Sequence, residues 1–232
     1  MIYAMLYQEN DMRLFHGSKD IIRTPEYGRG SPFNDYGLGF YCTEDIELAK
    51  EWACPIAKDG FANIYELDVS NLNVMNLSDG KYNTLNWMAL LLKNRTFIKK
   101  SPISKQASDY IIKEFLPDTT GYDVIRGYRA DDSYFSYAKD FLNNTISLRQ
   151  LSESMRFGKL GEQIVLISPM AFNNIKFKGY EVANASIYNT KRIERDNEAR
   201  FAYRDYDSIV APDDLFVRDI LIQEVKNDDP RL

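Results

Sequence analysis

The chain has 232 residues, 44% hydrophobic and 27% charged, which is ordinary for a globular protein, and its formal net charge of −5 does not favour a broad electrostatic grip on nucleic acid. One histidine and two cysteines, Cys42 and Cys54, supply neither a disulfide framework nor the usual ligands of a zinc site, so we expect no metal and regard both cysteines as packing residues. No run approaches the ~20 apolar residues that cross a membrane, and the first ten residues do not resemble a secretory signal, so we expect a cytoplasmic protein without a membrane partner.

The first quarter of the chain is expected to hold a short strand, a long loop and a helix. Residues 13–16 form the predicted strand, which Gly17 ends, and glycines and prolines punctuate the loop as far as Gly39. Thr43 is a good N-cap for the helix that follows, and Pro55 should kink or end it.

The middle of the chain is rich in helix signals. Ser147 and Gln150 form a capping box at the start of one of these helices. A short strand is expected at 123–125, followed by a turn at Gly127 and an aromatic-rich helix. The remaining predicted elements here are a strand at 61–69 and helices at 84–98, 108–115 and 147–158.

The last third returns to strands and ends in helix. "QIVLIS" at 163–168 is β-branched and predicts a buried strand, "IKF" at 175–177 predicts a short one, and a charged helix follows over 186–207. Strands near both ends with helices between them indicate an α+β fold. We expect one domain over residues 1–232, with a helical insertion at about 80–160.

A set of chemically suggestive residues surrounds the single histidine, His16. An imidazole beside Gly17 can offer a hydrogen bond where the bare backbone lets a ligand come close. Tyr41, after a glycine-rich turn, can present an aromatic face, and Trp52 on the adjoining helix can supply a second one. Far along the chain, Glu162 and Gln163 open a buried strand, where a polar group is costly unless it has a partner or a role.

The order of these motifs resembles the ADP-ribosyltransferase fold, in the branch of poly(ADP-ribose) polymerases and diphtheria-toxin-like enzymes. The motifs are His16-Gly17-Ser18, then Gly37-Leu38-Gly39-Phe40-Tyr41, then Trp52, then the strand that Glu162 opens. The stretch "YDVIRGYRADDSYF…GKLGEQIVLISPMAF" also resembles an uncharacterised bacterial family of ADP-ribosyltransferase-like proteins. The resemblance covers roughly residues 13–177 and implies a split β-sheet core that binds NAD as a co-substrate.

The resemblance also implies a role for each matched residue. His16 would hydrogen-bond the adenosine-side ribose of NAD, and the backbone of Gly17, with Ser18 close by, would hold the nicotinamide carboxamide. Tyr41 would stack on the nicotinamide ring with Trp52 packing behind it, and Gly39 would lie beside them in the same site. A late polar residue would bind the nicotinamide ribose and stabilise the oxocarbenium-like transition state.

Two residues compete for that last role. Glu162 matches the catalytic glutamate of the larger branch, whereas Gln163 matches a glutamine that the bacterial family favours. Adjacent residues on a strand point to opposite faces, so only one of them can reach the ligand. A carboxylate can also deprotonate an acceptor, which a neutral amide cannot do. Glu162 is the favoured candidate.

The function that this resemblance implies is NAD-dependent transfer of ADP-ribose to a macromolecular acceptor, a protein rather than a nucleic acid. The context that it suggests is a bacterial toxin-type effector, from a toxin–antitoxin or phage-defence system, with a cognate antitoxin protein as a possible partner. Two alternatives stay open. One is an NAD glycohydrolase with water as the acceptor, and the other is a non-catalytic module that binds NAD, ADP-ribose or a protein.

Two charged stretches have simpler explanations than a site. Asp131 and Asp132 precede a helix and are better explained as its cap than as a metal pair. The run "KRIERDNEAR" predicts a solvated helix face, although its arginines, Arg192, Arg195 and Arg200, could contact a partner.

Overall fold

The computed structural model describes residues 11–96, 101–130, 132–157, 161–206 and 210–232. The start of the chain, for which a secretory signal was considered, lies outside this part. So do Asp131 and the side chain of Asp132.

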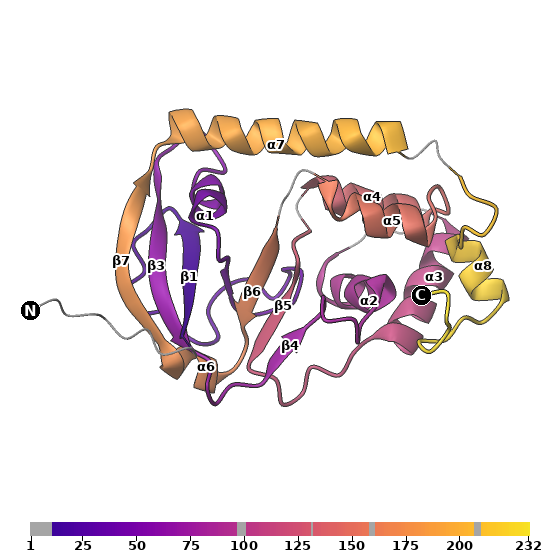
Figure 1. The fold of residues 1–232 in the computed structure, drawn as a ribbon, viewed down its shortest axis with the longest axis horizontal. Coiled ribbons are helices and arrows are strands. Elements are labelled where there is room, and N and C mark those ends of the chain that lie inside the picture. Colours follow the sequence, from indigo (N-terminus) through magenta and orange to yellow (C-terminus); the bar gives the residue numbers. More distant parts are fainter. Residues whose placement is uncertain (1–10, 97–100, 131, 158–160, 207–209) are drawn as a thin grey trace, which may run out of the picture.

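Two β-sheets stand side by side at the centre and one end of the molecule (Figure 1). Sheet A is antiparallel, with the strand order β1 (Asp11–Ser18), β3 (Gly60–Asp68), β7 (Ile175–Ala183). Sheet B is mixed, with the order β2 (Phe40–Cys42), β6 (Glu162–Leu166), β5 (Val124–Tyr128), β4 (Val74–Asn76), of which only the β4–β5 pair is parallel.

The two sheets meet at one backbone pair. Phe15 of β1 and Thr43, just after β2, exchange hydrogen bonds of 2.8 and 2.9 Å between their backbones. One residue further along β1, the side chain of His16 hydrogen-bonds the backbone carbonyl of Tyr41 in β2. A split between two sheets therefore opens beside His16.

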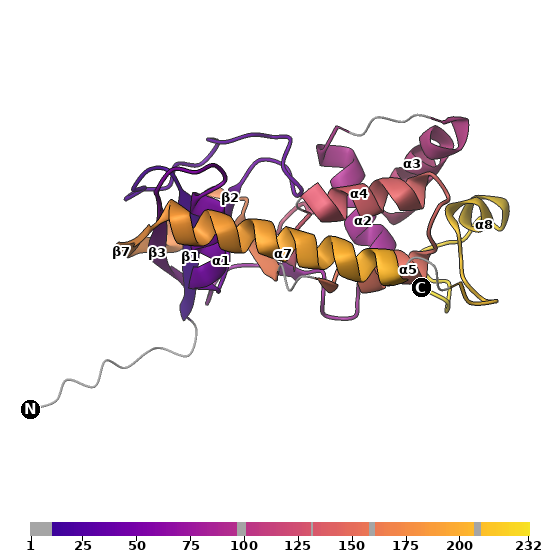
Figure 2. The same cartoon turned by 90° about the horizontal axis from the view of Figure 1, so that it is seen from above.

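Helices cover both sheets. Helix α1 packs on sheet A, while most of the others gather on one side of sheet B, and the long α7 passes over both groups (Figures 1 and 2). The helices are α1 (Ile46–Ala53), α2 (Thr84–Asn94), α3 (Pro102–Phe115), α4 (Asp132–Leu142), α5 (Leu148–Ser154), α6 (Pro169–Asn174), α7 (Ala185–Tyr206) and α8 (Val217–Ile222).

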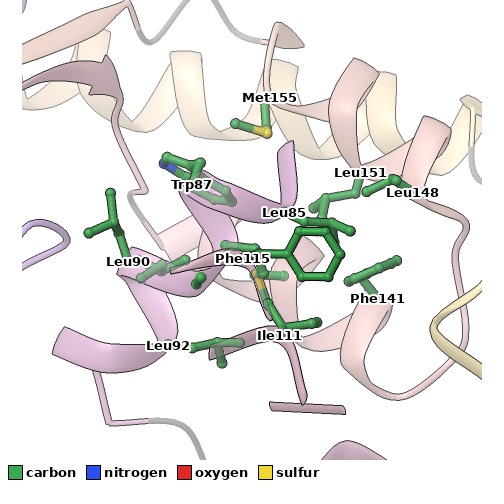
Figure 3. Close-up of a cluster of buried hydrophobic side chains, with 14 of the residues drawn as sticks. Leu85, Trp87, Leu90, Leu92, Ile111, Phe115, Phe141, Leu148, Leu151 and Met155 are labelled. Atoms are coloured by element: carbon green, nitrogen blue, oxygen red, sulfur yellow. The ribbon is translucent and has the colours of Figure 1, made fainter. Parts of the chain in front are cut away.

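The larger core lies between sheet B and the helical part of the chain. Apolar side chains from α2, α3, α4 and α5 interdigitate there, and almost none of their surface reaches water (Figure 3). They include Leu85, Trp87, Ile111, Phe115, Phe141 and Leu151. A second cluster joins the two sheets and contains Leu14, Phe40, Cys42, Tyr65, Leu67, Val124, Ile164 and Leu166.

Most elements expected from the sequence are present, and the fold is α+β as predicted. Ser147 and Gln150 form the expected capping box. The prediction that Thr43 caps α1 is wrong by two residues, because Thr43 pairs through its backbone with Phe15. Asp45 caps the helix instead, its Oδ1 accepting from Glu47 N at 2.8 Å.

The turn predicted at Gly127 is also wrong. Gly127 lies inside β5, opposite Gln163 in β6. A Cβ at this position would lie 2.5 Å from the hydroxyl oxygen of Tyr36, so the glycine makes room for a side chain from the loop after β1. The segment 80–160, expected as a helical insertion, therefore contains α2 to α5 and also a central strand of sheet B.

Candidate functional site

A cavity of about 970 Å³ opens where the two sheets part. Its volume lies at the upper end of the ~300–1,000 Å³ range that ligand pockets occupy. Its wall comes from β1, the loop that follows it, β2, α1, α7 and the ends of α2 and β5. The lining residues that matter below are His16, Asp35, Gly39, Phe40, Tyr41, Glu51, Arg95, Arg129, Ala130, Arg192 and Arg195.

His16 and Tyr41 meet at the point where the sheets separate. The Nδ1 atom of His16 lies 2.6 Å from the carbonyl oxygen of Tyr41. Because a carbonyl only accepts, Nδ1 carries a proton and Nε2 is the acceptor in the neutral ring. Burial lowers the pKa of His16 and so favours this neutral form. The imidazole also stacks on Phe40, with ring centroids 4.3 Å apart.

The phenol of Tyr41 is fixed by the loop before it. Its hydroxyl donates to the carbonyl of Gly37 at 2.7 Å and accepts from the backbone N–H of Tyr36 at 3.1 Å. Burial raises the pKa of this hydroxyl, which therefore stays protonated. The ring is held in one orientation on the cavity wall, as a stacking surface requires.

Two of the three glycines in the matched motifs, Gly17 and Gly39, serve packing. A Cβ on Gly17 would lie 1.9 Å from the carbonyl oxygen of Ala49 in α1, so this glycine allows the helix to sit directly on β1. A Cβ on Gly39 would lie 2.6 Å from Cγ1 of Val165 in β6. Gly39 lines the cavity and Gly17 does not, so the close approach of a ligand at Gly17 stays a prediction without geometric support.

Ser18 lies outside the cavity wall, in a network that shapes the loop after β1. Asn63 of β3, fully buried, donates through Nδ2 to Ser18 Oγ at 3.2 Å and to the carbonyl of Asp20 at 3.1 Å. Its Oδ1 accepts from the backbone of Ile22 at 2.9 Å. Asn63 thus fixes the chain between His16 and the part of the loop that lines the cavity.

Trp52 approaches the cavity through an arginine. The guanidinium of Arg129, which lines the cavity, lies 4.6 Å from the centre of the Trp52 ring system. Trp52 itself does not line the cavity, and its indole Nε1 is buried with no hydrogen-bond partner among the described residues. A direct stack of Trp52 on a ligand would need Arg129 to move.

The structure separates the two candidates on β6. Glu162 faces away from Tyr41: its carboxylate accepts hydrogen bonds of 2.6 Å from Ser78 Oγ and from Arg126 Nε. Gln163 shares the face of Tyr41, because Tyr41 pairs with Val165, two residues further along β6. Neither residue lines the cavity, but Gln163 lies directly behind a residue that does.

That residue is Asp35, which we did not single out from the sequence. Its Oδ2 accepts from the Gln163 amide at 2.7 Å and from the backbone N–H of Ala130 at 2.9 Å. The Asp35 side chain is only 5% exposed, and burial raises its pKa, although Arg95 and Arg129 oppose the shift. It resembled an ordinary loop residue, since nothing in its neighbours indicates burial.

Among the described residues, six arginines and five carboxylates make up the charged part of the wall. Arg95 makes an ion pair with Asp35 at 3.1 Å, and Arg195 binds Glu51 through two nitrogens at 2.8 and 2.9 Å. Arg192 donates to the carbonyl of Pro55 at 3.1 Å. Arg192 and Arg195 belong to the run predicted to be a solvated helix face, and both line the cavity.

The structure also bears on the expectations about metal ligands, cysteines and membrane-spanning helices. The described residues contain no group of three or more His, Cys, Asp or Glu side chains that could hold a metal ion. Cys42 and Cys54 are free and buried, and Cys54 Sγ lies 3.4 Å from the carbonyl of Ala183. Within the described ranges, none of the helices has both the length and the apolar character needed to cross a membrane.

Comparison with known proteins matches the chain to a family model. The family described as "Protein of unknown function (DUF3990)" matches residues 12–177, a span that holds His16, Asp35, Tyr41 and Gln163 but not α7. Neither the curated proteins nor the solved structures contain a match. Because the matched segment is well over half of the sequence, the chain belongs to the DUF3990 family.

Proposed function

We propose that the protein is an NAD-dependent ADP-ribosyltransferase that uses the cavity at the split between sheets A and B. The observation that carries this proposal is the pairing of His16 with Tyr41 in the wall of a cavity that several arginines also line. A histidine acceptor, a fixed aromatic ring and guanidinium groups together suit a ligand with hydroxyls, a flat ring and phosphates. NAD has all three.

Three parts of NAD, a ribose hydroxyl, the nicotinamide ring and the diphosphate, have matching groups in the cavity wall. The Nε2 atom of neutral His16 can accept a hydrogen bond from a ribose hydroxyl. Tyr41 offers a ring on which the nicotinamide can stack. Arg95, Arg129 and Arg192 offer donors to the diphosphate, which guanidinium groups bind more specifically than ammonium groups do.

The chemistry follows from the ligand. The bond between nicotinamide and ribose breaks with its electron pair passing to the nicotinamide nitrogen, which leaves a cationic, oxocarbenium-like ribose. The acceptor then attacks the anomeric carbon. The protein contributes by orienting the two parts of NAD and by stabilising the developing cation. A macromolecular acceptor, preferably a protein, is part of this proposal.

The test is incubation of the purified protein with labelled NAD and cell lysate, with nicotinamide release measured alongside. We expect label in macromolecules, and loss of both signals in His16→Ala and Tyr41→Ala. Tyr180→Ala, which removes an exposed aromatic ring from β7, is the control. Release of nicotinamide without labelling would favour a glycohydrolase, and NAD binding without either signal would favour a binding module.

A further inference from the structure

The cavity contains a carboxylate that no matched motif accounts for. Asp35 comes from the loop between β1 and β2, yet its side chain is almost fully buried in the cavity wall. Gln163 Nε2 and Ala130 N both donate to its Oδ2. Three parts of the chain thus converge on one carboxylate. A buried ionisable group held in this way beside a ligand-sized cavity is a candidate for function rather than for stability.

We propose that Asp35 is the catalytic carboxylate of this site and that Gln163 is its positioning residue. The inference rests on the proposed NAD chemistry and deepens it, because it assigns the acid–base role that Glu162 was expected to hold. Glu162 is engaged on the opposite face of sheet B by Arg126 and Ser78. Asp35 is the acidic side chain on the Tyr41 side of the sheet that touches the cavity and Gln163 together.

The pairing explains why an amide, rather than a carboxylate, stands at position 163. The two side chains approach to 2.7 Å, a distance at which two carboxylates cannot both be ionised. The Gln163 amide group donates to Asp35 and so favours its charged form. It also fixes the direction of the carboxylate relative to the backbone of Ala130. Gln163 therefore acts through Asp35 and needs no contact with the ligand.

Arg95 decides when the carboxylate is available. Its Nη1 lies 3.1 Å from Oδ1 of Asp35, in an ion pair without the alignment of a hydrogen bond. Arg95 also lines the cavity, so the phosphates of a bound dinucleotide compete with Asp35 for the same guanidinium. As Arg95 turns to the ligand, Oδ1 becomes free to accept a hydrogen bond from it.

The proton balance is complete without a further reactant. The nicotinamide leaves first, with the electron pair of the bond that breaks, and the acceptor group then forms its bond to the anomeric carbon of the cationic ribose. The acceptor's proton passes to Asp35 and from there to solvent. Burial raises the pKa of Asp35, which makes its carboxylate a better base than an exposed one. Before that step, the negative charge stabilises the cationic ribose.

The experiment compares nicotinamide release, NAD affinity and thermal stability in four proteins: wild type, Asp35→Asn, Gln163→Glu and the double variant with both changes. The double variant keeps one carboxylate and one amide in contact, but the carboxylate now stands at position 163, which does not line the cavity. Asp123→Asn is the matched control, since Asp123 is a buried carboxylate of similar exposure that does not line the cavity.

We expect Asp35→Asn to release nicotinamide at least ~100-fold more slowly than the wild type while binding NAD within a fewfold of it. The double variant should stay folded and equally slow. If the double variant regains the wild-type rate, or if Asp35→Asn is within about threefold of the wild type, Asp35 is not the catalytic carboxylate. A wild-type protein that neither binds nor cleaves NAD overturns the proposed function as well.

A pH profile supplies a measurement that does not depend on the folding of Asp35→Asn. The charged and titratable groups around Asp35 are Arg95, Arg129, Tyr36 and Tyr41, and His16 is a further titratable residue of the cavity wall. His16→Gln keeps an acceptor but cannot titrate. We expect kcat/KM of this variant to fall as Asp35 takes up a proton on the acid side. A flat acid side in His16→Gln contradicts the inference.

Discussion

Arg195 of α7 binds Glu51 of α1 through two nitrogens, Nε to Oε2 at 2.9 Å and Nη2 to Oε1 at 2.8 Å. Both residues line the cavity. The pair joins a helix that packs on sheet A to a helix that also reaches the helical part of the molecule (Figure 2). It therefore fixes the width of the cavity on the α7 side.

Glu51→Ala should destabilise the protein strongly. The Glu51 carboxylate is 3% exposed and Arg195 is 24% exposed, so the truncation removes two hydrogen bonds from a largely buried guanidinium. Such a loss costs about 3–5 kcal/mol, and the exposed part of Arg195 argues for the lower end. Urea denaturation measures the change. Glu153→Ala, which removes an exposed ion pair of 3.7 Å with Arg156, should change stability by less than about 0.5 kcal/mol.

Asp35→Asn should change how stability depends on pH. Because the pKa of Asp35 is raised in the folded protein, the folded state binds more protons than the unfolded state above pH ~4. The wild type therefore loses stability as the pH rises through the folded pKa, and the variant does not. The gap in unfolding free energy between variant and wild type should grow in the variant's favour above pH ~4 and then level off.

His16 should act in the opposite direction, and the same titration separates the two. Its pKa is lowered by burial, so the wild type should lose stability as the pH falls below about 6.5, where the unfolded imidazole takes up a proton. His16→Gln should show a flatter curve there. Thermal melts from pH 4 to 8 measure both effects. A wild-type curve parallel to that of both variants contradicts these assignments.

Gly17→Ala discriminates between packing and ligand approach. The added methyl carbon would meet the Ala49 carbonyl oxygen at 1.9 Å and the Ala53 nitrogen at 2.8 Å, so α1 must shift away from β1. Overpacking of this kind typically costs 1–3 kcal/mol, and contact with the helix backbone argues for about 3. Melting temperature and NAD affinity are measured together. Normal stability with weakened NAD binding would restore the expectation that a ligand approaches this glycine.

Gln163→Ala and Glu162→Ala should have unequal effects. Removing the Gln163 side chain leaves Asp35 without one of the two donors to its Oδ2. The carboxylate then loses its fixed direction and part of the support for its charged form, which should slow nicotinamide release by roughly tenfold or more. Removing Glu162 takes its carboxylate away from Ser78 and Arg126 on the other face, where Arg126 keeps its ion pair with Glu44 at 3.0 Å. Its effect on the rate should be smaller. The reverse order would reinstate Glu162 as the residue that faces the ribose.

Short-range signals in the sequence predicted most of the elements. The capping box of Ser147 and Gln150 joins residues three positions apart, and the β-branched run of β6 is contiguous, so each could be identified without knowing the fold. Thr43 shows where this reasoning fails. Threonine is a common N-cap residue, but the backbone of Thr43 instead pairs with that of Phe15, which belongs to another strand.

The site depended on contacts that sequence distance hides. Asp35 and Gln163 lie 128 residues apart, and no sequence pattern around either residue indicates contact with the other. Arg192 and Arg195 stand in a run that alternates charges as any solvated helix does, and only the path of α7 brings them to the cavity. His16 and Tyr41 could be singled out because glycines flank them in recognisable motifs.

The path of the chain after residue 177 sets a lower limit on the length of any functional fragment. The family match ends there, yet five of the β3–β7 pairs, from Gly60–Ala183 to Ile64–Gly179, lie beyond it. One of them joins Tyr180 to Asn63, the residue that itself pairs with His16. A fragment cut at 177 would bare the edge of β3 beside the histidine and lose Arg195 from the opposite wall. The shortest piece that could fold and hold a ligand is thus longer than the piece by which relatives are recognised.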